Sequence, residues 1–173
     1  MIRRVPFGDL KIGPLARAKI KAALDRNWVS EGENVREFEE KFAAKFGWKH
    51  AIATSSGTDA GIVAWSAVRE LGGFNHAALE EDGDYGLQPT FGKVITPACA
   101  FVATANCLLA AGLKPRFIDV DLETLNMRLL EFADVQSGGD ILGIQFVATM
   151  GKPTSIGQIA AAADKHNLYL ISD

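Results

Sequence analysis

The apolar positions of this chain follow two different periods. Between residues 14 and 47 they recur every three or four positions with charged residues between them, which predicts two amphipathic helices. Pro14 suits the first position of the earlier helix, and Gly47 suits the end of the later one. After residue 50 the apolar residues gather in short runs separated by helical stretches, which predicts buried strands that alternate with helices.

The predicted strands are AIAT (51–54), KVIT (93–96), PRFIDVD (115–121), the apolar run 141–147 and LYLIS (168–172). The helices between them cover about 58–71, 101–112 and 155–166. This alternation is typical of an α/β fold with a mostly parallel sheet flanked by helices. Ligands bind such sheets at the carboxyl ends of the strands, so the residues that follow each strand are the first candidates for a site.

A chain of 173 residues has the length of one domain. Within residues 1–173 we expect a helical N-terminal segment over 1–48 and the alternating strand and helix core over 49–173. The stretch of about 74–92 has four acidic residues, a proline and little periodicity. We therefore predict a surface loop inserted into the core there.

Charge and composition narrow the class of function. The 18 Lys and Arg and 21 Asp and Glu residues are interleaved and leave a net charge of −3, so no basic face for a nucleic acid is expected. The apolar runs are too short for a membrane span or the core of a signal peptide, which favours a cytoplasmic protein without membrane partners. The two cysteines and three histidines lack metal-ligand spacing, and we expect no metal site.

The segment Ser56-Gly57-Thr58 lies between a predicted strand and the start of a helix. Free backbone amides, the helix dipole and two hydroxyl groups would suit a phosphate there. The same residue types are also ordinary turn and cap residues, so the segment alone does not establish a phosphate site.

Two further residues follow predicted strands. Asp173 ends an apolar strand, where its carboxylate needs either a cation, such as a protonated ring nitrogen, or a helix to cap. Phe101 opens a helix at the same edge, where its ring would either cover a flat ligand or pack between helix and sheet.

Five motifs in this order resemble a known family: NWVSEG (27–32), VREFEEKFAAKFG (35–47), HAIATSSGTDA (50–60), KVITPACAFVATANCLLAAGLKPRFIDVDLETLNM (93–127) and GKPTSIGQIAAAADKHNLYLISD (151–173). Together they resemble the amino-terminal half of the DegT/DnrJ/StrS-type sugar aminotransferases. The resemblance implies part of the large domain of the aspartate-aminotransferase-like fold (fold type I), which binds pyridoxal 5′-phosphate.

Carried over by position, the resemblance implies that Gly57 and Thr58, with Ser56 beside them, hold the cofactor phosphate. It implies that Phe101 stacks on the pyridine ring and that Asp173 pairs with the protonated ring nitrogen. The family's Schiff-base lysine is expected beyond Asp173, so no catalytic residue is assigned within this chain. The carboxyl-terminal half and the small domain are likewise expected outside it.

The family implies a two-stage transfer. An amino donor, commonly glutamate, leaves its nitrogen on the cofactor as pyridoxamine 5′-phosphate, and a nucleotide-linked keto sugar then takes it. A homodimer is implied, in a pathway that makes either a cell-surface polysaccharide or a secondary metabolite. Two alternatives stay open: a relative that uses pyridoxamine 5′-phosphate for sugar dehydration, with histidine in place of the lysine, and a truncated or split-gene product that binds a ligand or subunit without turnover.

Overall fold

The computed structural model describes residue 8 and residues 10–71, 92–128 and 141–173. The expected inserted loop of 74–92 lies outside these ranges except for Gly92. The chain divides into two units, Met1–Ala53 and Thr54–Asp173, and each is described by itself.

The first unit contains two helices, α1 (Pro14–Asp25) and α2 (Glu33–Phe46). Proline begins α1, and α2 ends at Gly47, whose φ of 71° lies in the left-handed region that glycine adopts without strain. One side of α2 presents an aromatic ridge, in which the ring centroids of Phe42 and Phe46 are 4.7 Å apart and Trp48 lies 5.6 Å from each. The predicted amphipathic helix is therefore confirmed.

The second unit is an α/β layer structure. Its strands are β1 (Lys93–Pro97), β2 (Lys114–Ile118), β3 (Ile141–Phe146) and β4 (Tyr169–Ser172), and its α-helices are α3 (Gly57–Leu71), α4 (Val102–Ala110) and α5 (Ile156–Lys165), with a short 3-10 helix, η4, at Thr149–Gly151. The described strands form one sheet in the order β2-β1-β3-β4, and every neighbouring pair is parallel. For the pairs β1–β2 and β3–β4, parallel pairing follows from the helical crossovers α4 and α5, because each crossover returns the chain to the same end of the sheet. The predicted α/β class and parallel sheet are confirmed.

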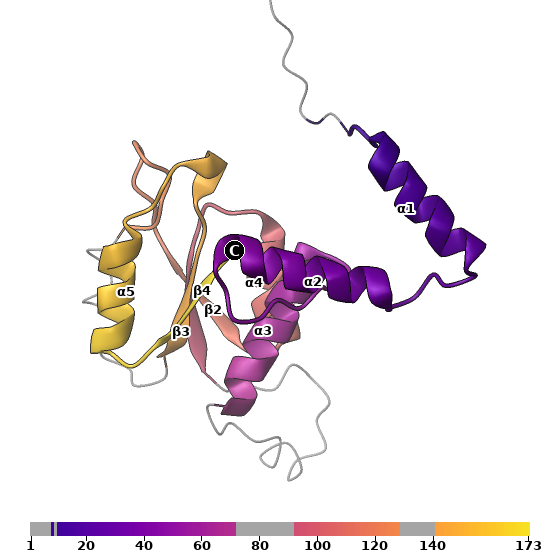
Figure 1. Ribbon diagram of the computed structural model, residues 1–173. Helices are drawn as coiled ribbons and strands as arrows, with labels where there is room; N and C mark the ends of the chain where they lie inside the picture. The colour runs from indigo at the N-terminus through magenta and orange to yellow at the C-terminus, as the bar shows by residue number, and fades with distance from the viewer. Residues whose placement is uncertain (1–7, 9, 72–91, 129–140) are drawn as a thin grey trace, which may run out of the picture. The chain divides into compact units, whose positions relative to one another are not determined.

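Helices cover both faces of this sheet, with α5 on one side and α3 and α4 on the other (Figure 1). The core beneath α5 consists of Ile95, Ile118, Met127, Ile144, Phe146, Ile159 and Ala163. The core beneath α3 and α4 consists of Trp65, Val68, Val94, Cys107, Leu108, Ala111, Leu113 and Leu142. Burial on both faces explains why the two central strands, β1 and β3, appear in the sequence as nearly continuous apolar runs.

The α3–α4 pair packs closely where a glycine faces a cysteine. A Cβ atom added at Gly61 would lie 2.9 Å from the Sγ atom and 3.0 Å from the Cβ atom of Cys107. Real Cβ atoms do not approach side chains that closely, so the absence of a side chain at Gly61 sets the distance between the two helices at this point.

Two predicted strands differ from the structure. Residues 51–54 form no strand, and Ile52 is 76% exposed, because no described strand pairs with this segment. The strand predicted over 115–121 covers Lys114–Ile118, and Asp119 and Asp121 follow it. An isolated bridge between Val120 and Met127 closes the turn after β2. Among the described residues no helix is long and apolar enough to cross a membrane.

Candidate functional site

The start of α3 presents backbone donors at the amino end of the second unit. The Ser56 hydroxyl oxygen accepts a hydrogen bond from the Asp59 N–H at 3.1 Å, and the Ser56 carbonyl accepts one from Ala60 at 3.0 Å. The N–H groups of Gly57 and Thr58 belong to the first turn of the helix, where the helix itself offers no acceptor. With the positive end of the helix dipole, these groups can hold an anion.

Asp59 stands beside this turn as a charged side chain. The Ser55 hydroxyl donates a hydrogen bond to Asp59 Oδ2. Side-chain hydrogen bonding to the carboxylate by Ser55, and then by Ser56, lowers the pKa of Asp59, so this carboxylate is ionised at neutral pH. The carboxylate is directed to Ser55, one residue before the segment expected to hold a phosphate.

Asp173 directly follows β4 and is anchored through both its backbone and its side chain. Its N–H donates to the carbonyl of Phe146 in β3 at 2.9 Å. The Thr104 hydroxyl of α4 donates to Asp173 Oδ2 at 2.5 Å. Gln145 of β3 turns its side-chain nitrogen toward the same oxygen at 3.5 Å. The carboxylate is therefore held at the carboxyl edge of the sheet by two other elements.

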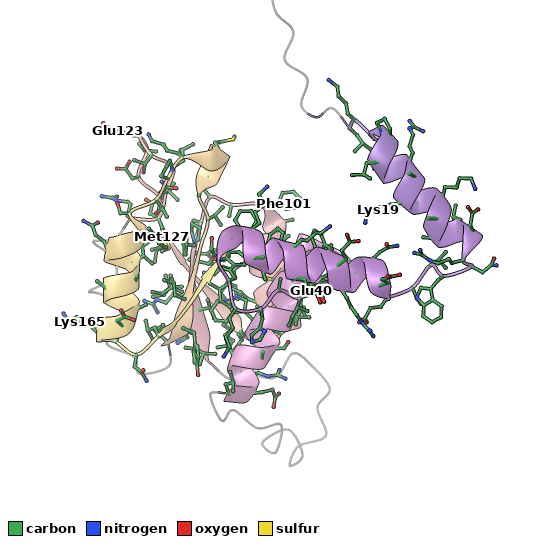
Figure 2. All side chains as sticks on the ribbon, in the orientation of Figure 1. Lys19, Glu40, Phe101, Glu123, Met127 and Lys165 are labelled. Carbon is green, nitrogen blue, oxygen red and sulfur yellow. The ribbon has the colours of Figure 1, made fainter. Side chains whose placement is uncertain are left out.

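Phe101 occupies the N-cap position of α4, with extended φ and ψ of −65° and 144°. Its side chain is 80% exposed (Figure 2), so it does not pack between the helix and the sheet. The ring borders a hollow of about 260 Å³ at the end of β1. This hollow is lined by Pro97, Ala98, Ala100, Phe101, Val102, Thr104, Ala105 and Phe117. An exposed ring at this edge is available to cover a flat ligand.

The structure connects two of the three sequence-predicted positions, Phe101 and Asp173, through helix α4. Phe101 caps the helix that contains Thr104, and Thr104 is bonded to Asp173. The Ser56-Gly57-Thr58 segment begins α3, whose Trp65 is bonded to Gln145. The sequence alone did not predict a role for Thr104, Gln145 or Trp65. The signal available for Gln145 was an amide side chain inside an otherwise apolar strand.

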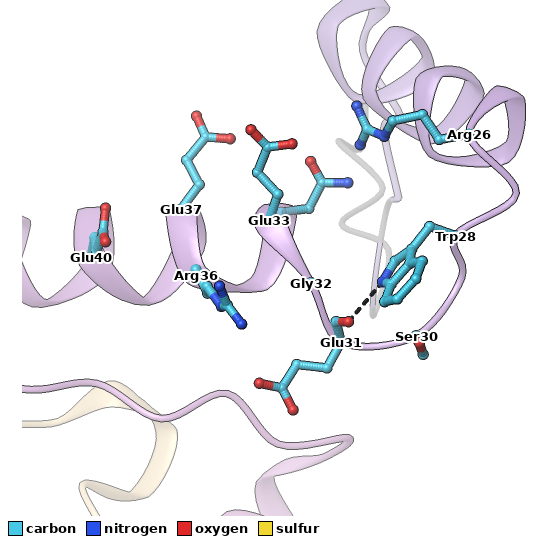
Figure 3. Close-up of a pocket in the computed structure, with 10 residues that line it drawn as sticks. Arg26, Trp28, Ser30, Glu31, Gly32, Glu33, Arg36, Glu37 and Glu40 are labelled. Atoms are coloured by element: carbon cyan, nitrogen blue, oxygen red, sulfur yellow. Dashed lines mark hydrogen bonds between the residues drawn. The ribbon is translucent and has the colours of Figure 1, made fainter.

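A separate hollow of about 900 Å³ lies in the first unit, and Figure 3 shows it in close-up. It is lined by Arg26, Trp28, Ser30, Glu31, Gly32, Glu33, Asn34, Arg36, Glu37 and Glu40. The Trp28 indole N–H donates to the carbonyl of Glu31 at 2.7 Å and closes the turn before α2. Through this contact, the NWVSEG motif stabilises the turn that leads into α2.

The two acidic residues after β2, Asp119 and Asp121, accept hydrogen bonds from backbone N–H groups. Asp121 Oδ1 accepts the N–H groups of Glu123 and Thr124 at 3.1 and 2.8 Å, and the contact with Thr124 lowers the pKa of Asp121. Asp119 Oδ1 accepts the N–H of Val120 at 2.8 Å. Within the described ranges, no group of three or more His, Cys, Asp or Glu residues is placed to hold a metal ion.

Comparison with known proteins identifies the family. Residues 11–173 match the DegT/DnrJ/EryC1/StrS aminotransferase family, and the chain belongs to it. The resemblance inferred from the five motifs is thereby confirmed.

Two curated relatives and one solved structure are longer than this chain, which covers only part of their length. It is 31% identical to the lipopolysaccharide biosynthesis protein RfbH of Salmonella typhimurium, over 89% of this chain and 32% of the relative. It is 30% identical to the spore coat polysaccharide biosynthesis protein SpsC of Bacillus subtilis, over 98% of this chain and 39% of the relative. The structure of the E. coli GDP-4-keto-6-deoxy-D-mannose-3-dehydratase with bound hydrated pyridoxal phosphate matches 98% of this chain and 40% of that one, with 25% identity and a TM-score of 0.78. The fold is thus that of fold type I pyridoxal-phosphate enzymes, and the chain spans about a third to two fifths of these relatives.

Proposed function

We propose that this chain forms the cofactor-binding part of an enzyme that moves an amino group from glutamate, or a similar donor, to a nucleotide-linked keto sugar with pyridoxal 5′-phosphate. The main observation in support is the Asp173 carboxylate, whose two described side-chain contacts, from Thr104 and Gln145, both fall on Oδ2. A carboxylate held through one oxygen can pair with a cation through the other, and a protonated pyridine nitrogen is such a cation.

The chemical groups of the residues present match those that the cofactor requires. A phosphate requires donors, and the first turn of α3 offers the N–H groups of Gly57 and Thr58 together with the Thr58 hydroxyl. A pyridine ring requires a flat apolar neighbour, and Phe101 is exposed at the correct edge. The fully buried Thr96 on β1 has a hydroxyl oxygen without a partner in the described part of the chain, so this edge retains unused polar capacity.

Each part of the chain has its own task in this proposal. The start of α3 binds the phosphate, Phe101 orients the ring, and Asp173 keeps the ring nitrogen protonated. Bound pyridoxal 5′-phosphate supplies an electron sink for the carbanion formed during amino transfer. The proton-shuttling lysine is expected beyond Asp173, so we assign no catalytic residue among residues 1–173. We further propose that the protein serves polysaccharide synthesis, as the names of the two curated relatives suggest. The family resemblance leads us to propose also that it acts as a homodimer.

The second candidate function is sugar dehydration with pyridoxamine 5′-phosphate. It is favoured by the similarity to the GDP-4-keto-6-deoxy-D-mannose-3-dehydratase structure. Mass spectrometry of a nucleotide-linked keto sugar incubated with the full protein and glutamate separates the two, because amination and loss of water change the mass differently. A nucleotide sugar that keeps its mass would instead support the alternative of a truncated or split-gene product that binds a ligand without turnover.

Cofactor binding is tested with pyridoxamine 5′-phosphate and with pyridoxamine, which lacks the phosphate. Neither has an aldehyde, so neither forms imines with surface lysines. Equilibrium dialysis should show the phosphate form binding about tenfold tighter or more, as charge-assisted hydrogen bonds predict. Thr58→Val should reduce that preference, and Thr154→Val, a matched substitution on another segment, should leave it unchanged. Equal binding of the two compounds by a folded protein would contradict the proposed phosphate site.

A further inference from the structure

A chain of polar contacts runs from the buried Trp65 of α3 through the buried Gln145 of β3 to the exposed Asp173 after β4. The Trp65 indole N–H donates to Gln145 Oε1 at 2.8 Å. Trp65 is fully buried and Gln145 is 1% exposed. Gln145 Nε2 then lies 3.5 Å from Asp173 Oδ2. Trp65 and Gln145 are 80 positions apart in the sequence, and Gln145 and Asp173 are 28 positions apart, so only the fold brings them together.

The Trp65 contact determines which end of the Gln145 amide faces Asp173. An indole nitrogen is a donor only, so the amide oxygen must lie on the Trp65 side. The amide nitrogen, with its two hydrogens, must then face the carboxylate. The contact of 3.5 Å is long for a hydrogen bond, so Gln145 acts mainly as a fixed dipole whose positive end is directed at the charge.

The surroundings of Gln145 explain why this arrangement is specific. A buried amide costs free energy unless its polar atoms are bonded, and the flanking residues of β3 are buried. Cys107 Sγ, the other close polar neighbour of the amide, lies 3.6 Å from Nε2 and 3.7 Å from Oε1. Trp65, Cys107 and Asp173 are therefore the partners that make a glutamine tolerable at this position.

We propose that Gln145, oriented by Trp65, is a positioning residue for the Asp173 carboxylate. Gln145 and Thr104 act on the same oxygen, Oδ2, and so direct the other oxygen toward the ring nitrogen of the cofactor. This inference rests on the proposed function for its consequence, since it assumes that Asp173 pairs with the ring nitrogen. The contact between Gln145 and Asp173 is testable without any cofactor.

The first experiment follows the indole N–H resonance of Trp65 by NMR in protein with isotope-labelled tryptophan, assigned with Trp65→Phe. Asp173→Ala should move this resonance, because the effect passes through Gln145. In a Gln145→Met background the same change should have no further effect, since methionine keeps the length of the side chain but offers no amide. Gln158→Met on the exposed side of α5 is the matched control and should leave the response to Asp173→Ala intact. If the chemical shift of the Trp65 indole N–H stays the same after Asp173→Ala, the inference is overturned.

The second experiment compares pyridoxamine 5′-phosphate with its analogue in which C–H replaces the ring nitrogen. Gln145→Met and Trp65→Phe should weaken the binding of pyridoxamine 5′-phosphate by about threefold, because the dipole directed at Asp173 is lost, and the binding of the analogue by less than about twofold. Equal losses for both compounds would mean a merely structural role and would overturn the inference. If the unmodified protein binds the two compounds equally, the ring-nitrogen pairing of the proposed function fails, and the NMR result decides on Gln145 independently.

Discussion

Thr104 in α4 and Asp173 after β4 are 69 positions apart in the chain, yet the Thr104 hydroxyl donates to Asp173 Oδ2 at 2.5 Å. Thr104 is 3% exposed, so water competes little for its hydroxyl. This bond connects α4, the helix that Phe101 caps, to the strand end that presents the carboxylate.

Thr104→Val removes the hydroxyl and keeps the side-chain shape. We expect the affinity for pyridoxamine 5′-phosphate to fall about five- to tenfold or more, because hydrogen bonds to charged groups are worth more than neutral ones. Thr104→Ser keeps the hydroxyl and should retain most of the affinity. Equilibrium dialysis of both variants checks this, and a serine variant as weak as the valine variant would assign the loss to packing.

Phe101→Ala should weaken binding of the ring without destabilising the chain. The side chain is 80% exposed, so its removal leaves no cavity in the folded protein. Loss of an aromatic contact should reduce the affinity for pyridoxamine 5′-phosphate by about two- to tenfold. Phe101→Tyr retains the ring face and should bind normally. A lowered melting temperature for Phe101→Ala would speak against the exposed position of this ring.

Gly61→Ala should destabilise the second unit, because its Cβ atom would lie 2.9 Å from Cys107 Sγ. Overpacking of this kind costs about 1–3 kcal/mol of unfolding free energy, measurable by urea denaturation. In the double variant, Cys107→Ala should restore part of the unfolding free energy that Gly61→Ala loses. Gly157→Ala in α5 is the matched control: no atom lies within 4 Å of its added Cβ, so the higher helix propensity of alanine should leave stability unchanged or raised.

The two cysteines should react differently with thiol reagents. Cys99 is exposed, whereas Cys107 is buried, and burial, together with the nearby Asp173 charge, raises the pKa of the Cys107 thiol. A protonated, inaccessible thiol is a poor nucleophile. Alkylation of the native protein should therefore modify Cys99 alone, with Cys107 reacting only after denaturation. Mass mapping of a Cys99→Ser variant checks this, and rapid labelling of Cys107 in that variant would contradict the buried placement.

Acid should weaken the interaction between α1 and α2 within the first unit. Hydrogen bonds from Lys19 and then Lys41 lower the pKa of Glu37 from 4.5 to about 2. A depressed pKa in the folded state means that the contribution to stability is present above pH 4.5 and is lost as the pH falls toward about 2. The effect should be small, because the three side chains are exposed.

Glu37→Gln should remove this acid-dependent loss, which helix content followed by circular dichroism can measure between those pH values. Glu40→Gln removes a charge from the same helix but leaves the Lys19–Glu37–Lys41 contacts in place, so its pH profile should match that of the unmodified chain. Added salt should flatten the difference, as it does for exposed charges. Identical acid profiles for all three proteins would contradict the prediction.

Local patterns predicted most elements of the second unit because each buried strand and each amphipathic helix is set by its own side chains. The segment 51–54 is the instructive exception. Its apolar residues suit a strand, yet a strand exists only through a neighbour, and none of the described strands pairs with it. The positions of Asp173 and Phe101 at the carboxyl edge were likewise predictable, since parallel strands place their ends together.

The sequence by itself determined the order of elements, the α/β class, the family and the residue types at the strand ends. Tertiary structure alone decided which side chains surround Asp173. Thr104 of α4 and Gln145 of β3 contact Asp173, and Trp65 of α3 contacts Gln145. These contacts depend on the β3–β4 register and on the packing of two helices on one face of the sheet. Such contacts depend on the spatial arrangement of distant segments, so no local pattern of polar and apolar residues specifies them.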